Sequence, residues 1–215
     1  ENHDKAPLET PQSSPQTSGG TEDWAPKFLC ASLKSPILLS DGRITTCTLD
    51  HNGVNEIANI HDHSFDECMT RYEATRFSAM ADPVSKPMCY KCFRSQSRWK
   101  TAGVPRSGWM KRSFGDDEIS SFKSSFTPQK ITMNIELSSK CNLRCIGCGL
   151  SEPNFRETRS SANIDMDRLK DWVADGVGHI EQLRLYHMGE TWLHPRWAEF
   201  AYFVKERRND ISLFT

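Results

Sequence analysis

Three cysteines in one short segment, Cys141, Cys145 and Cys148, have the residue type and spacing best suited to chemistry in this chain. They are spaced as Cys-x3-Cys-x2-Cys and directly follow a strand-like run with alternating apolar residues. Three thiolates on one loop can hold three irons of a cubane cluster and leave the fourth iron open to a substrate or cofactor. A structural zinc site needs a fourth ligand, and no cysteine or histidine follows within the next dozen residues. Reduced core cysteines are the remaining interpretation.

The segment 141–148, Cys-Asn-Leu-Arg-Cys-Ile-Gly-Cys, resembles the cluster loop of the radical S-adenosylmethionine (radical SAM) superfamily, including the Asn and Arg after the first cysteine. The resemblance implies a [4Fe-4S] cluster on Cys141, Cys145 and Cys148, whose open iron chelates S-adenosylmethionine. An electron from the cluster would cleave the sulfonium and give a 5′-deoxyadenosyl radical that abstracts a hydrogen from the substrate. Gly147 is a departure, because many members carry an aromatic residue there that frames the adenine.

A second segment, 188–191, reads Met-Gly-Glu-Thr and follows a strand predicted at 183–186. It stands in the place of the Gly-Gly-Glu-Pro motif of the family and keeps its Gly-Glu centre. Gly189 permits a close approach of the backbone, and Glu190 can accept a charge-assisted hydrogen bond from the ammonium group of the cofactor. The alternative is that Glu190 simply caps the next helix.

Four cysteines nearer the N-terminus form a second group, and their spacing alone fits either a closed iron–sulfur cluster or a zinc site. These are Cys30, Cys47, Cys89 and Cys92. This part of the chain is similar to the twitch and SPASM domains of many radical SAM enzymes. The similarity lies in the order of its features: a Cys, an Asp-Gly hairpin, a Cys, an Asn-Ile element at 59–60, a helix and Cys-x2-Cys. That resemblance implies an auxiliary [4Fe-4S] cluster in a module that precedes the radical SAM domain, as in twitch domain-containing radical SAM proteins. Cys68 lies on an apolar helix face and is interpreted as a core thiol.

Composition limits the partners and the location. The chain has 215 residues and a formal net charge of −1, so no electrostatic argument favours a nucleic-acid partner. The mean hydropathy is −0.61 and no run reaches the length of a membrane span, so no membrane association is expected. Close cysteine pairs among the eight cysteines suit metal sites better than disulfides, and a reducing cytoplasm is the expected location.

The elements that must position these residues alternate along the chain. A hairpin is predicted in 36–48 around Asp41-Gly42, with a type I′ turn. Further strands are predicted at 131–137, 183–186 and 211–214, and helices at 64–80, 165–175 and 196–208. Such alternation favours parallel β/α units, in which chemistry lies on loops after the carboxyl ends of strands.

The predicted fold class is α/β: the N-terminal part of a partial (β/α)6 TIM-like radical SAM barrel, preceded by a small α+β cysteine-rich domain. The predicted divisions are a disordered tail or linker at 1–23, a twitch/SPASM-like domain at 24–95, a connector with a short helix at 96–130, and the radical SAM domain at 131–215. Residues 131–215 hold two β/α units and the start of a third strand, so we expect a fragment that is inactive alone.

The resemblance therefore predicts a radical SAM enzyme that acts on a peptide, a protein or a carbohydrate-linked molecule, with flavodoxin or ferredoxin as the kind of electron donor. Two other functions stay open, a zinc-stabilised interaction module and an iron–sulfur electron-transfer protein that does not use S-adenosylmethionine. Glu190 argues against the electron-transfer protein, because such a carrier needs no ammonium acceptor.

Overall fold

The computed structural model describes residues 29–90, 110–111, 115–124, 130–146, 148–151 and 162–215. The tail predicted at 1–23, most of the predicted connector, and Cys92 lie outside these residues. The strands are β1 (Leu29–Cys30), β2 (Ile37–Leu38), β3 (Arg43–Thr45), β4 (Glu56–Asn59), β5 (Met110–Lys111), β6 (Ile131–Ile135), β7 (Ile180–Arg184) and β8 (Ser212–Phe214). The α-helices are α1 (Phe65–Ala81), α3 (Asp116–Ser124), α5 (Met166–Gly176) and α6 (Trp197–Arg207).

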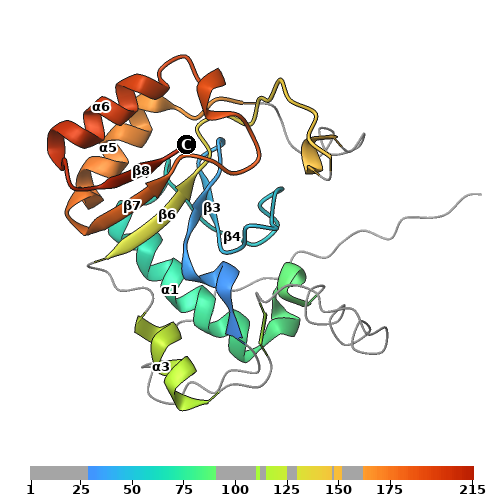
Figure 1. The fold of residues 1–215 in the computed structure, drawn as a ribbon. Coiled ribbons are helices and arrows are strands. Elements are labelled where there is room, and N and C mark those ends of the chain that lie inside the picture. The colour runs from blue at the N-terminus through green and yellow to red at the C-terminus, as the bar shows by residue number, and fades with distance from the viewer. Residues whose placement is uncertain (1–28, 91–109, 112–114, 125–129, 147, 152–161) are drawn as a thin grey trace, which may run out of the picture.

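Six of these strands form one mixed sheet in the order β4-β3-β2-β6-β7-β8 (Figure 1). Strands β2, β6, β7 and β8 are parallel, and β3 and β4 continue the sheet in antiparallel pairing. The protein is therefore an α/β protein with a mixed sheet. Because β2 pairs with β6, the sheet continues across the boundary that the sequence suggested between 24–95 and 131–215.

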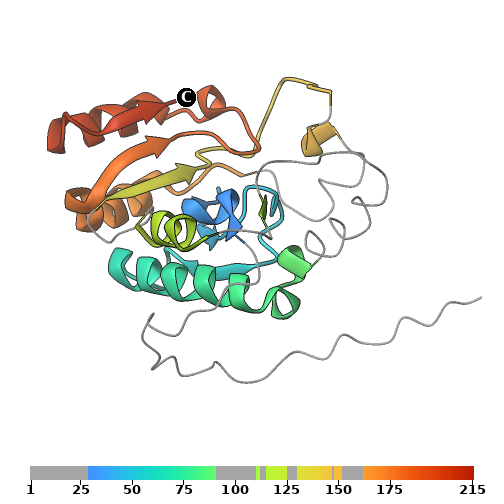
Figure 2. The same cartoon turned by 60° about the horizontal axis from the view of Figure 1, so that its bottom comes forward.

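Helices α1, α5 and α6 cover one face of this sheet (Figures 1 and 2). Strand β6 shows why, because Ile131, Met133 and Ile135 alternate with polar residues and all three are buried in the main core. The helices contribute large side chains to the same core, among them Phe65 and Trp172, whose ring centroids are 4.7 Å apart. The helix-facing side of the sheet is thus the apolar side.

The hairpin that joins β2 to β3 forms as predicted, but its turn differs from the prediction. The Gly42 N–H donates to the Leu39 carbonyl over 3.0 Å, and the Leu39 N–H donates to the Arg43 carbonyl over 2.8 Å. Three residues therefore form the loop, with Gly42 last at φ +88°. The prediction of a type I′ turn, in which Asp41 and Gly42 would be the two loop residues, was wrong. The loop has three residues and needs a positive φ at the last of them.

The other predicted elements form with modest shifts. Helix α1 begins after Ser64, whose hydroxyl accepts the Glu67 N–H in a reciprocal capping box. Helix α5 begins after Asp165, whose carboxylate accepts two backbone N–H groups. Strand β7 was expected to begin at 183, yet pairing with β6 extends it back to Ile180. None of the described helices has the length and apolar character required to cross a membrane.

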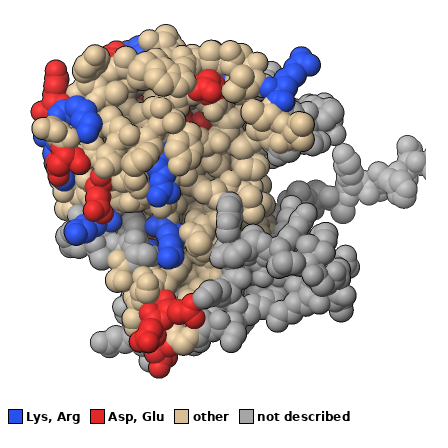
Figure 3. All heavy atoms as spheres, in the orientation of Figure 1, with Lys and Arg blue, Asp and Glu red and all other residues tan. Residues whose placement is uncertain are grey.

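A smaller apolar cluster lies beside α1, away from the main core. It contains buried residues from four separate segments, namely Leu29, Cys30, Leu33, Ala79, Met80, Cys89 and Phe122. Phe122 belongs to α3, the short helix predicted within the connector, and its ring lies 4.5 Å from the buried Arg76 guanidinium. The acidic first turn of α3 forms the red group at the bottom of Figure 3.

Candidate functional site

The Gly189-Glu190 segment lies directly against the backbone that leads into Cys141. A Cβ atom on Gly189 would lie 2.6 Å from the Ser138 carbonyl carbon and 2.8 Å from the Ser139 Cα. The Glu190 N–H donates to the Lys140 carbonyl over 2.8 Å. The structure therefore brings together two motifs that lie far apart in the sequence, and it explains why position 189 must be glycine.

Strand order accounts for this meeting. Strands β6 and β7 are parallel neighbours, so the segments that leave their carboxyl ends emerge at the same edge of the sheet. The Thr191 hydroxyl closes the loop after β7 by donating to the Leu185 carbonyl. The buried Glu136 carboxylate, just beyond β6, accepts the Met188 N–H over 3.3 Å. Thr191 thus has a specific hydrogen-bonding role in this loop.

The segment that enters the cysteine loop is held on its other side as well. The Ser138 hydroxyl donates to the Asn163 side chain over 2.8 Å. Ser139 makes three hydrogen bonds with Ala162, because its N–H and hydroxyl donate to the carbonyl while its hydroxyl also accepts the Ala162 N–H. The backbone before Cys141 is therefore fixed between the segment before α5 and the segment after β7.

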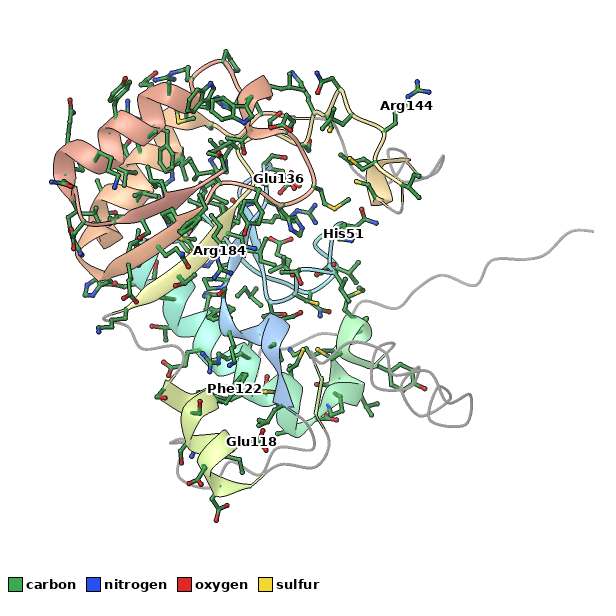
Figure 4. All side chains as sticks on the ribbon, viewed as in Figure 1. His51, Glu118, Phe122, Glu136, Arg144 and Arg184 are labelled. Atoms are coloured by element: carbon green, nitrogen blue, oxygen red, sulfur yellow. The ribbon has the colours of Figure 1, made fainter. Side chains whose placement is uncertain are left out.

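The cysteine loop itself is more open than its anchor. Cys145 is exposed, whereas Cys141 and Cys148 are partly buried. The Leu143 N–H donates to the Cys141 sulfur over 3.4 Å, the kind of N–H···S bond that stabilises a thiolate ligand. Arg144 extends outward from this loop (Figure 4). Within the described residues, no three cysteine, histidine or carboxylate side chains are gathered to hold a metal ion.

The Glu190 carboxylate has a local role in this structure. It precedes a short 3₁₀ helix, Thr191–Leu193, and accepts the Trp192 N–H over 3.5 Å. This long bond corresponds to the capping alternative for Glu190. A contact at the edge of hydrogen-bonding distance is weak, so the carboxylate can exchange it for a charged donor.

The N-terminal cysteines come together in part. Cys30 and Cys89 are both buried in the small apolar cluster. Burial raises the pKa of the Tyr72 phenol, and the negative charges that Cys30 and Cys47 can carry raise this pKa further. Both thiols therefore lie near the Tyr72 phenol. The Cys47 sulfur accepts the Leu49 N–H over 3.4 Å, as Cys141 does from Leu143. Three predicted auxiliary ligands thus lie in one region, and the fourth, Cys92, is not among the described residues.

Cys68 is fully buried in the main core, as predicted. Burial raises the pKa of its thiol to about 11, because a thiolate would lose its hydration there. It therefore belongs to the packing of α1 and is separate from both cysteine groups.

Motif reasoning missed the polar residues on the face of β6 opposite the helices. Asn134 and Glu136 are both buried there, and the partner of Asn134 in the next strand is Arg184. His51 and His187 also meet nearby, with ring centroids 5.5 Å apart. Figure 4 labels Glu136, Arg184 and His51. The strict alternation of apolar and polar residues along β6 could have predicted that Asn134 lies on the face away from the helices. It could not have predicted which residues of other segments lie beside Asn134.

No protein-family model, curated protein or solved structure that was compared with this chain matches it. The functional argument therefore depends on the site itself.

Proposed function

We propose that this chain is part of a radical SAM enzyme, with Cys141, Cys145 and Cys148 as ligands of a [4Fe-4S] cluster. The observation that supports the proposal most is the contact of Gly189 and Glu190 with the backbone that leads into Cys141. This contact supports the proposal because Glu190, the proposed ammonium acceptor, follows directly in the segment that lies against the start of the cysteine loop. The N–H···S bond to Cys141 fits a thiolate ligand, and the exposed loop leaves room for the sulfurs to converge on a cluster.

The residues of the chain would divide the work as follows. The three thiolates would hold the cluster, which when bound supplies the electron for reductive cleavage of S-adenosylmethionine. Glu190 would release the Trp192 N–H and accept the ammonium group of the cofactor, because a charge-assisted hydrogen bond is stronger than a long bond to a neutral donor. Gly189 would keep that carboxylate close to the loop.

The same proposal includes the finer fold assignment and a second centre. Strands β6 to β8 would be the first strands of a partial (β/α)6 barrel, and the twitch-like segment would be joined to it through β2. Cys30, Cys47, Cys89 and Cys92 would hold an auxiliary [4Fe-4S] cluster. Cys30 and Cys89 lie in the small apolar cluster, and Cys30 and Cys47 lie near Tyr72, which supports this set. A cytoplasmic location and a flavodoxin-like or ferredoxin-like electron donor follow from the same proposal.

The test is the metal content of anaerobically reconstituted protein, with electron spin resonance spectra before and after addition of S-adenosylmethionine. We expect about eight irons per chain and a spectral shift with the cofactor, and Cys141→Ala should lose about four irons and the shift. Cys68→Ala is the matched control, because this thiol is buried in the core and should not affect iron content. Zinc with little iron, or iron content independent of Cys141, would reject the enzyme in favour of a zinc-stabilised interaction module or another role.

A further inference from the structure

A row of side chains crosses the face of the sheet opposite helices α1, α5 and α6. Residues paired across neighbouring strands point to the same face, and this row runs through Thr45, Ile37, Asn134, Arg184 and Phe214. The residues adjacent to them in the strands, such as Leu38 and Ile135, belong to the main core. An amide and a guanidinium therefore occupy the centre of the opposite face, on adjacent parallel strands.

The loop between β3 and β4, residues 46–55, extends over this face. Its organising residue is Asp50, a buried carboxylate that accepts the Thr45 hydroxyl, the Val54 N–H and the Asn55 N–H, each over 2.7 Å. His51, next to Asp50 in the loop, meets His187, which follows β7. Because β2 and β6 lie between β3 and β7 in the sheet, the loop reaches past both strands to the segment after β7.

Several buried amide atoms lie in the loop and in the strand beneath it without protein partners. The Asn134 Oδ1, both amide atoms of Asn55 and the Asn52 Oδ1 have no hydrogen-bond partner among the described residues. Asn134 is 5% exposed and Asn55 is 6% exposed, so bulk water does not readily compensate them. Buried polar side chains in folded proteins normally have hydrogen-bond partners, and a buried polar group without one destabilises the folded state. Three such amides in one region indicate a ligand that supplies their hydrogen-bond partners.

We propose that the region between the 46–55 loop and strands β6 and β7 binds a hydroxyl-rich ligand with an anionic group, such as a sugar phosphate. Three of the four unpartnered atoms are acceptor oxygens and one is a donor nitrogen. Hydroxyl groups both donate and accept, so a sugar can satisfy all four, whereas each peptide unit offers only one donor. Arg184, the neighbour of Asn134 in the pairing of β6 with β7, carries a guanidinium that suits a phosphate and that donates to the Gln182 Oε1 over 3.0 Å.

The position of this site connects it to the proposed function, on which its role as a substrate site depends. The 46–55 loop contains Cys47 and reaches His187, two residues before Gly189. The carboxylate of Glu136 joins the same face to the Met188 N–H. A ligand under the loop would therefore lie between the two cysteine groups, where a radical enzyme would present its substrate.

The experiment uses the full chain without metal, so that its outcome is separate from iron binding. The probes are glucose 6-phosphate and ribose 5-phosphate, with glucose and inorganic phosphate for comparison, in thermal-shift and calorimetric titrations. We expect at least one sugar phosphate to raise the Tm and bind at least tenfold more tightly than glucose or phosphate. Asn134→Leu should abolish this binding and raise the Tm of the ligand-free chain by at least about 2 °C, because it removes an unpartnered buried amide. Arg184→Met should weaken sugar phosphate binding at least tenfold.

Thr132→Val is the matched control, because Thr132 lies on the same strand two residues before Asn134 and should leave binding unchanged. If the Tm of Asn134→Leu is at or below that of the unsubstituted chain, the Asn134 amide already has hydrogen-bond partners within the protein. This result would overturn the proposed ligand site. Failure of both sugar phosphates to bind would overturn the ligand class. Sugar phosphate binding by a chain that takes up no iron on reconstitution would keep the site and remove its role in a radical SAM enzyme.

Discussion

The contact between Gly189 and the Ser138-Ser139 backbone gives the sharpest test of the site geometry. An added Cβ would lie 2.6 Å from the Ser138 carbonyl carbon and 2.8 Å from the Ser139 Cα, about 1 Å closer than ordinary carbon contacts. Because backbone atoms cannot rotate away, Gly189→Ala must displace one segment from the other. Overpacking of this kind costs about 1–3 kcal/mol, and loss of the hydrogen bond between Glu190 and Lys140 adds about 0.5–1.5 kcal/mol.

The expected loss of about 1.5–4.5 kcal/mol in the free energy of unfolding corresponds to a decrease in Tm of about 3–18 °C in a chain of this size. Heat denaturation of the metal-free chain, followed by circular dichroism, measures it. Gly178→Ala is the matched control, because a Cβ at Gly178 meets no atom within 4 Å. After reconstitution, Gly189→Ala should also lose the spectral response to S-adenosylmethionine. Equal Tm values for the two variants would refute the close packing, and an intact response to the cofactor would refute the proposed role of this segment.

Three further predictions address the surrounding elements. Ser64→Ala should lower the Tm by about 2–4 °C, since loss of an N-cap costs about 1 kcal/mol, and an unchanged Tm would contradict the capping box. Iodoacetamide at pH 8 should label the exposed Cys145 in the metal-free chain well before Cys68, whose pKa is about 11; mass spectrometric mapping that found the reverse order would contradict the burial. Hydrogen bonds from Arg196 lower the pKa of Glu199 to about 2. The ionised Glu199 carboxylate therefore stabilises the fold fully above the pKa that it has in the unfolded chain, and this stabilisation is lost as the pH falls toward 2. Glu199→Gln should flatten the Tm profile in that pH window, and an unchanged slope would contradict the ion pair.

Local sequence predicted the elements whose signals are local. The apolar period of α1 and its Ser64 cap lie within a few residues of each other, so the helix and its buried face were both predictable. The Asp41-Gly42 pair predicted a hairpin for the same reason, although the three-residue loop depends on how the flanking strands twist. The start of β7 was missed because Ile180, Glu181 and Gln182 carry no strong strand signal, and only pairing with β6 extends the strand to them.

The sequence predicted the general placement of distant segments but not their atomic contacts. Parallel β/α units were expected to bring Gly189 and Cys141 to loops at the carboxyl ends of strands, and β6 and β7 are indeed parallel neighbours. The contact of Gly189 with the Ser138-Ser139 backbone was not predicted. The pairing of β2 with β6 is also a long-range choice that no local pattern specifies. Asn134 was passed over because a single amide in a strand has no motif. Its importance comes from its buried Oδ1, which has no hydrogen-bond partner in the part of the chain that the structure describes.

The continuous sheet gives the strongest physical reason to consider the two cysteine groups together. Cys47 lies near the start of the 46–55 loop, which Asp50 holds to Thr45, and His51 in that loop meets His187 beside the Gly189-Glu190 segment. Two modules joined only by a linker would let each cysteine group take any orientation toward the other. Here β2 pairs with β6, so the position of the 46–55 loop is fixed relative to the strand that leads into Cys141. Under the proposed function, a reaction at the Cys141 loop would occur beside a surface that the N-terminal segment helps to build, and substrate selection would be a property of both parts.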